Sequence, residues 1–171
     1  MSELKLNVGC GGDKKPKEEG WINIDVRKEA NPDIIVDIEK CSLPFKDETF
    51  DYILAKDVVE HVSWRKTQEL LKEFAGVLKK GGKIYIQVPD FEAIVKMWLN
   101  QEEKFKKFMG DVLDSIKLSF WIFGNQDYPE NTHKACFIAK DLKVMLERAG
   151  FEVEYIKNDG STNLMCEAVK K

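Results

Sequence analysis

Short apolar runs alternate with amphipathic segments along most of the chain. Five such runs, each bounded by turn residues or charges, predict buried strands over residues 4–9, 21–26, 33–38, 50–58 and 83–89. Two later runs, 151–159 and 162–171, predict a closing antiparallel hairpin across the sequence Asp-Gly-Ser. The chain therefore supplies enough strands for one continuous sheet.

A helical period separates the fourth and fifth of these strands. Its apolar positions share one face: Leu70, Leu71, Phe74, Val77 and Leu78. We predict a helix over residues 63–82, with Ser63 as its N-cap and Gly81 and Gly82 as its stop. A second helix is predicted over 139–150, where Gly150 ends the pattern.

Residues 90–138 differ from the rest of the chain. They hold two aromatic-rich helical stretches, 91–99 and 105–123, and then a polar loop that reads GNQDYPENTHK. The remaining strands and crossovers predict an α/β, Rossmann-like sheet that is mostly parallel, with an antiparallel closing strand and helices on both faces. The first three crossovers are short, so some are expected to be loops. We expect a single domain, 1–171, in which 90–138 is an insertion after the fifth strand.

Composition limits the partners. The chain has 171 residues, enough for one domain with a substantial core, and is 43% hydrophobic and 33% charged. Its 27 basic and 30 acidic residues give a net charge of −3, so no nucleic-acid partner is expected. The sequence has neither the apolar run of a membrane span nor a signal-peptide start, which favours a cytoplasmic protein without a membrane partner. The oligomeric state stays open.

The cysteines and histidines do not form a recognisable metal motif. The four cysteines, Cys10, Cys41, Cys136 and Cys166, include no CxxC pair, and the only histidines are His61 and His133. Metal sites that can be read from sequence bring such residues close together along the chain. We therefore predict no metal site and reduced thiols.

A glycine-rich turn follows the first strand. Gly9, Cys10 and Gly11 match the start of the dinucleotide fingerprint, but Lys14 stands where the third glycine belongs. The next residues, 13–19, have no apolar helical face and contain Pro16. Since a pyrophosphate group prefers the amino end of a helix, the turn argues against a nicotinamide-dependent oxidoreductase.

Two acids end the second and third predicted strands. Asp25 can accept hydrogen bonds from the two hydroxyls of a ribose, and Asp37 can accept one from an adenine amino group while Ile38 packs on the ring. Both acids could instead be solvated strand ends or turn residues. A ligand with a ribose diol, an adenine-like base and no phosphate fits the pattern, and S-adenosylmethionine has these parts.

Several motifs together resemble one protein family. They are LNVGCGG, INID, the ordered set LPF, FDYI and EHV, GGKIYIQVPD and LKVMLERAGFEV, and they cover most of the chain except roughly 91–138. The sequence resembles a class I S-adenosylmethionine-dependent methyltransferase of the small "type 11" kind. Many members carry an acid at the position of Asn7, which here is neutral, and the first crossover is shorter than usual.

The resemblance implies roles for the residues of these motifs. Gly9, Cys10 and Gly11 would surround the methionine part of the cofactor, and the main chain at Ala55 and Lys56 would meet its amino group. The ribose and adenine would contact Asp25, Val26, Asp37 and Ile38. Cys10 is expected to act through its N–H rather than as a reactive thiol.

The acceptor is less well indicated. Asp57, Asp90 and His133 are the candidate substrate contacts, and His133 could deprotonate a hydroxyl near neutral pH. Asp90 could instead cap the helix that follows it, His133 could be a plain loop residue, and His61 is expected to be structural.

The sequence LAKD replaces the D/N-P-P-Y/F motif of enzymes that methylate nucleic-acid bases, which favours a small-molecule or sugar-type acceptor covered by residues 90–138. A non-catalytic, methyltransferase-like binding or partner subunit is the alternative.

Overall fold

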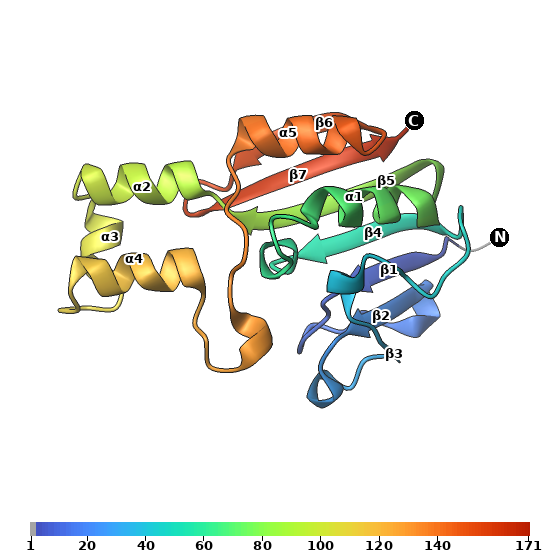
Figure 1. Cartoon of the computed structure of the whole chain (residues 1–171), viewed down its shortest axis with the longest axis horizontal. Helices are drawn as coiled ribbons and strands as arrows, with labels where there is room; N and C mark the ends of the chain where they lie inside the picture. Colours follow the sequence, from blue (N-terminus) through green and yellow to red (C-terminus); the bar gives the residue numbers. More distant parts are fainter. Residues whose placement is uncertain (1–2) are drawn as a thin grey trace.

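The computed structural model describes residues 3–171 and contains one seven-stranded sheet with the strand order β3-β2-β1-β4-β5-β7-β6 (Figure 1). The five strands from β3 to β5 are parallel neighbours, whereas β7 runs antiparallel to both β5 and β6. The strand bounds are β1 Lys5–Val8, β2 Trp21–Asp25, β3 Ile34–Ile35, β4 Phe50–Lys56, β5 Leu78–Pro89, β6 Phe151–Asn158 and β7 Asn163–Lys170. The predicted sheet and its closing hairpin are confirmed.

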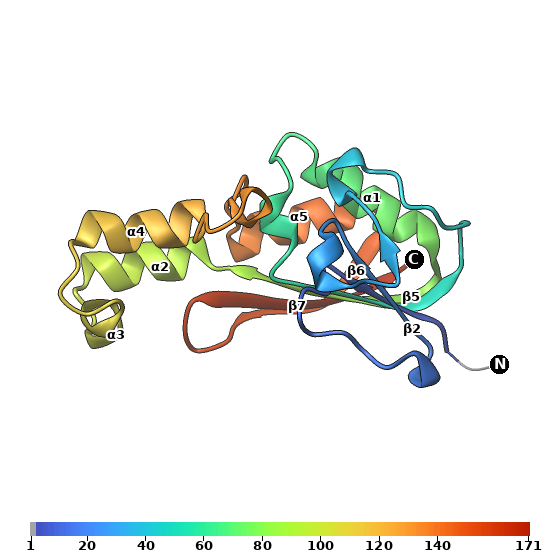
Figure 2. The same ribbon diagram turned by 90° about the horizontal axis from the view of Figure 1, so that it is seen from below.

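Two helices cover one face of the sheet. The helices α1 (Thr67–Val77) and α5 (Ala139–Arg148) lie side by side on that face in Figure 2, while the 3-10 turn η1 (Lys17–Glu19) lies on the opposite side. Apolar side chains of α1 and α5 bury completely against β-strand residues such as Ile84 and Ile86. On the other face the neighbouring positions Lys83, Tyr85 and Gln87 are half-buried. The alternation of β5 therefore assigns its aliphatic side chains to the helix-covered core.

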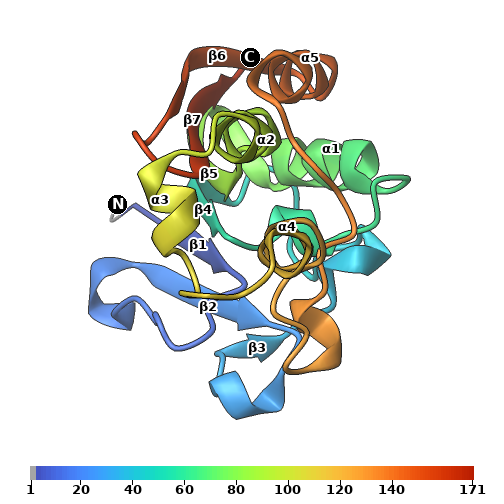
Figure 3. The same cartoon turned by 90° about the vertical axis from the view of Figure 1, so that its left-hand side faces the viewer.

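The remaining helices lie beyond the carboxyl ends of the central strands. They are α2 (Phe91–Leu99), α3 (Glu103–Lys107) and α4 (Asp114–Phe123), and the view along the strands places them in front of the carboxyl ends of β1, β4 and β5 (Figure 3). Within residues 3–171, no helix is long and apolar enough to cross a membrane. The predicted helix at 91–99 is confirmed, and β5 feeds directly into it.

The helix predicted over 63–82 is shorter than expected. It begins at Thr67, and Ser63 lies in the preceding turn, where its carbonyl oxygen accepts a hydrogen bond from the Thr67 N–H. The helix ends at Val77 because Leu78 is extended and pairs with Phe50. The two glycines are therefore not a helix stop.

Gly81 and Gly82 instead lie inside β5, where the pairing with β4 shifts register. Gly81 has a φ of 77°, and a Cβ on Gly82 would lie 2.9 Å from the carbonyl oxygen of Lys79. A left-handed residue and a close backbone approach both favour glycine, so the pair shapes an irregular strand.

Two other expectations need correction. The stretch 105–123 is two helices rather than one, because Met109 and Gly110 both have positive φ and reverse the chain between α3 and α4. The third strand covers only Ile34 and Ile35, at the sheet edge, and Asp37 already caps a 3-10 turn. The first three crossovers contain only 3-10 turns, as their length predicted.

Candidate cofactor and acceptor site

The glycine turn begins where β1 ends. Gly9 has a φ of 62°, and a Cβ at this position would lie 2.3 Å from Cγ2 of Val58, so only glycine fits here. The Cys10 N–H donates to the carbonyl oxygen of Ile24 at 3.0 Å, and the Gly11 N–H donates to Oδ2 of Asp25 at 2.8 Å. The turn is thus held against the end of β2.

Asp25 is the last residue of β2 and is almost completely buried. Besides the bond from Gly11, its Oδ1 accepts the Arg27 N–H at 2.8 Å and lies 3.5 Å from Nε of Arg27. The Arg27 guanidinium in turn stacks on the ring of Tyr128, 4.2 Å from its centroid. The carboxylate is therefore fixed in position, and the loop containing Tyr128 is drawn toward it.

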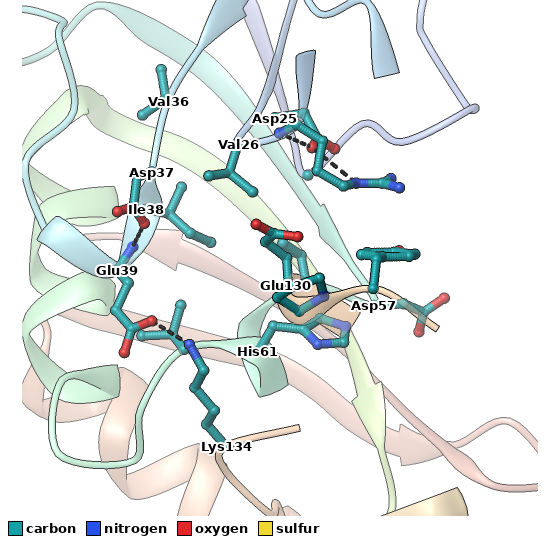
Figure 4. A pocket seen from close by; sticks show the side chains of 16 residues that line it. Asp25, Val26, Val36, Asp37, Ile38, Glu39, Asp57, His61, Glu130 and Lys134 are labelled. Carbon is teal, nitrogen blue, oxygen red and sulfur yellow. Dashed lines mark hydrogen bonds and ion pairs between the residues drawn. The ribbon is translucent and has the colours of Figure 1, made fainter. Parts of the chain in front are cut away.

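Apolar and acidic side chains alternate along the next part of the rim. Asp37 is partly exposed, and its Oδ1 accepts the Glu39 N–H at 3.0 Å, which caps the 3-10 turn η3 (Ile38–Lys40). Figure 4 shows Val26 and Ile38 on the inner side of the cavity, between Asp25 and Asp37. Two apolar side chains thus line the cavity close to two carboxylates.

These residues line a cavity of about 340 Å³. Six of its lining residues are among those singled out in the sequence: Gly9, Asp25, Val26, Asp37, Ile38 and Asp57. The others were not assigned to the ligand site from sequence: Arg27, Val36, Glu39, Val58, His61, Val62, Tyr128, Pro129, Glu130 and Lys134. Four of these come from the polar loop after α4, where only His133 had been singled out.

An ion pair fastens this loop. Nζ of Lys134 bonds the carboxylate of Glu39, which joins the loop to η3 across the mouth of the cavity (Figure 4). The backbone N–H groups of Lys134 and Ala135 both donate to the carbonyl oxygen of Glu60, at 2.7 and 3.1 Å. The loop is therefore a fixed wall of the cavity.

Other residues singled out in the sequence lie beside the cavity without lining it. Cys10 and Gly11 contribute N–H groups to the turn, Ala55 is completely buried at the end of β4, and the Lys56 side chain is exposed. Asp90 is the N-cap of α2, where its Oδ1 accepts the Ala93 N–H and its Oδ2 accepts Nδ2 of Asn158. The structure gives Asp90 the capping geometry, away from the lining residues.

The two histidines are neighbours. Their ring centroids are 5.0 Å apart, and His61 lines the cavity whereas His133 is not among its lining residues. Burial lowers the pKa of both imidazoles, so both rings are neutral near pH 7. Burial also raises the pKa of Glu60, which precedes His61, to about 8. This concentration of buried titratable groups beside a cavity is typical of functional sites.

Comparison with known proteins places this geometry in context. Residues 19–86 match a family model described as a methyltransferase domain. An uncharacterised protein of Methanocaldococcus jannaschii, MJ1123, is 33% identical over 114 residues, which are 63% of this chain and 54% of that protein. The chain thus spans about half the length, or less, of the curated relatives that it matches.

Solved structures share the fold. The PH0226 protein of Pyrococcus horikoshii has a TM-score of 0.69 at 16% identity, covering 100% of this chain and 83% of that one. A SAM-dependent methyltransferase from Methanosarcina mazei has a TM-score of 0.66 at 20% identity, covering 99% and 92%. At these identities the likeness establishes the fold alone.

Proposed function

We propose that this chain is a class I S-adenosylmethionine-dependent methyltransferase, which transfers a methyl group from that cofactor to a small-molecule or sugar-type acceptor. The observation that carries the proposal is the shared cavity. Asp25 and Asp37 both line it, with Val26 and Ile38 near them (Figure 4). Two carboxylates close to apolar side chains suit a ribose diol and an adenine ring.

The glycine turn supports a ligand without a pyrophosphate. The crossover after β1 contains only the three-residue 3-10 turn η1, so it offers no long helix whose amino end could stabilise a diphosphate. The main chain from Gly9 to Gly11 can instead hold the methionine part of the cofactor. We assign the backbone at Ala55 and Lys56, next to β1 in the sheet, to the methionine amino group.

Methyl transfer asks little of acid–base chemistry. When bound, the cofactor would supply an electrophilic methyl group on a positively charged sulfur, and no acid would be needed because the sulfur would leave as a neutral thioether. The protein chiefly aligns the acceptor with the methyl group and excludes water. A base is needed only for a weak nucleophile such as a hydroxyl, and His133 was the sequence candidate for that role.

The segment 90–138 is proposed to select the acceptor. Its loop contributes Tyr128, Pro129 and Glu130 to the lining of the cavity that Asp57 and His61 also line. An acceptor bound between this loop and the carboxyl ends of the strands would lie next to the methyl group. We propose that 90–138 acts as a lid over the acceptor.

The proposal is tested by titrating the protein calorimetrically with S-adenosylmethionine and S-adenosylhomocysteine, with NAD as the control ligand. Replacing Asp25 by Ala should weaken binding of both sulfur ligands by about 1.5–3 kcal/mol, the value of a hydrogen bond to a charged group. The exposed Asp111→Asn variant is the matched control and should bind normally. Unchanged affinity in Asp25→Ala would refute the ribose assignment.

A second assay separates catalysis from cofactor binding alone. Transfer of a labelled methyl group to hydroxylated small molecules or sugars would establish turnover. Binding of the cofactor without transfer to any acceptor would favour a non-catalytic, methyltransferase-like subunit. Failure to bind either sulfur ligand would overturn the proposal.

A further inference from the structure

Glu60, His61 and His133 lie close together, and His61 also lines the cavity. One ligand atom from each residue can be chosen so that all three atoms lie within 4.8 Å of one another. The first two residues belong to the 3-10 turn η4 (Val59–His61), and the third comes from the loop after α4. The sequence predicted no metal site, because His61 and His133 are far apart along the chain and only the fold brings them together.

Hydrogen bonds orient both imidazoles. Nδ1 of His61 lies 3.2 Å from the carbonyl oxygen of Thr132, and Nδ1 of His133 lies 3.1 Å from that of Trp121. A carbonyl oxygen can only accept, so each Nδ1 carries the proton, and each Nε2 keeps a lone pair. Metal-binding histidines are commonly held in this way, by a backbone carbonyl at the other ring nitrogen.

Glu60 supplies a second and independent observation. Its residue is only 2% exposed, and its Oε2 has no hydrogen-bond partner in residues 3–171. A buried polar atom without a partner costs about 1–3 kcal/mol, so such atoms normally have one. The ligand atoms nearest to this carboxyl group include a nitrogen of each imidazole, and a cation bound by all three side chains would give Oε2 a partner.

We propose that Glu60, His61 and His133 bind a divalent transition-metal ion. Two imidazole nitrogens and one carboxylate oxygen suit Zn²⁺, Co²⁺ or Mn²⁺ better than Ca²⁺ or Mg²⁺, which prefer all-oxygen sites. Ligands of a tetrahedral ion lie about 3.3 Å apart for bonds of 2.0–2.1 Å, so the three side chains would close slightly around it.

Three protein ligands leave an open coordination position, as in catalytic rather than structural metal sites. Because His61 also lines the cavity with Asp57 and Glu130, the open position is on the cavity side. Water, or an oxygen atom of a bound acceptor, would fill it. This last consequence rests on the proposed function, but the metal site itself does not. His133 would then be a metal ligand and not the general base.

The test is a titration of the tag-free protein with Co²⁺ and Zn²⁺, followed by calorimetry and, for Co²⁺, by visible absorption. A Cys136→Ser background removes the one exposed thiol among the cysteines. We expect one ion per chain. Each of Glu60→Gln, His61→Ala and His133→Ala should weaken binding by more than the roughly 10–100-fold that follows when only a hydrogen-bond partner of a metal ligand is removed. Glu152→Gln removes an exposed carboxylate on β6, outside both the cluster and the cavity, so it is the matched control.

A second measurement does not depend on the variants being folded. The chain has only two histidines, so its imidazole NMR signals belong to His61 and His133 alone. Zn²⁺ should shift both sets of signals together, and Mg²⁺ should shift neither. The proposal is overturned if Zn²⁺ leaves either histidine unchanged, or if folded Glu60→Gln binds Co²⁺ as tightly as the parent protein. Cofactor binding is measured separately, so its failure would not be confused with failure of the metal site.

Discussion

Two crossovers on this sheet each connect a pair of parallel strands, but they are stabilised by different interactions. Residues 57–77 connect β4 to β5 through the helix α1, whereas residues 9–20 connect β1 to β2 with only a three-residue 3-10 turn. Both connections join parallel strands, and both begin at the rim that carries the cavity. The difference teaches how a parallel pair can be held when the crossover supplies no apolar helix.

The helical crossover relies on apolar burial. Leu70, Leu71 and Phe74 are completely buried between α1 and the sheet, and Val77 is 1% exposed. This is the stripe that the sequence showed, and its burial is the main reason a helix of only eleven residues is stable here.

The short crossover relies on buried amides. Asn23, in the middle of β2, is completely buried, and its Oδ1 accepts Nδ2 of Asn7 and the Lys15 N–H, at 3.0 and 2.7 Å. Its Nδ2 donates to the Lys15 carbonyl oxygen and to Oδ2 of Asp33, at 2.9 and 2.8 Å. All four hydrogen-bonding positions of this amide are used, so the network replaces a packed helix without an unsatisfied group.

The largest predicted loss of stability comes from a substitution in the helical crossover. Phe74→Ala should lower the free energy of unfolding by about 3–5 kcal/mol, because it removes a large side chain from a well-packed core. Urea unfolding followed by circular dichroism measures the loss. A loss below 1 kcal/mol, on the same scale, would mean that α1 is not held by its apolar stripe.

The helical crossover was also the more predictable of the two. A stripe such as Leu70, Leu71 and Phe74 reports local periodicity, and the same residues that form the helix also bury it. Its end was misplaced because the pairing of Leu78 with Phe50 is a long-range contact that extends β5 backward. Local glycine signals could not compete with that pairing.

The short crossover and the acceptor side of the cavity were harder to predict from the sequence. Asn7 was noticed only as a departure from a family pattern, since its partner Asn23 lies in the next strand. In the same way, Tyr128 and Lys134 approach the cavity through Arg27 and Glu39, which are far away in the chain. Residues at strand ends could be assigned because a parallel sheet brings its carboxyl ends together, whereas loop residues depend on contacts that no local pattern encodes.

The next largest predicted loss of stability comes from a substitution in the short crossover. Asn23→Leu should destabilise the protein by about 2–3 kcal/mol. Nδ2 of Asn7 would lose one of its two acceptors, and both backbone groups of Lys15 would lose the amide that pairs with them. The measurement is again urea unfolding. Tyr85→Phe is a matched control on the opposite half of the sheet, where a half-buried hydroxyl is removed without touching this network. Equal stability of Asn23→Leu and the parent would show that the amide network does not hold the crossover.

The smallest predicted effect depends on pH and sharpens the same comparison. Desolvation raises the pKa of Asp33, but hydrogen bonds from the Asn23 side chain and N–H and from Lys17 outweigh it and hold that pKa well below its usual range. The folded protein therefore binds fewer protons here than the unfolded chain does. The stabilisation is present above the ordinary carboxyl pKa, near 4, and is lost as the pH falls below it.

Asp33→Asn tests this point directly. At pH 7 it should cost only about 1 kcal/mol, because Lys14 and Lys17 lie toward solvent, where screening weakens their attraction to the carboxylate. The cost should shrink as the pH falls through the acid range, since the parent then loses the charge that the variant never had. Urea unfolding of both proteins, from neutral pH to the start of acid denaturation, measures the difference in stability. Phe74→Ala is the control. It removes no titrating group, so its cost should not follow the same pH curve. A pH-independent cost for Asp33→Asn would mean that the short crossover is held by the shape of its side chains and not by the charge at its edge.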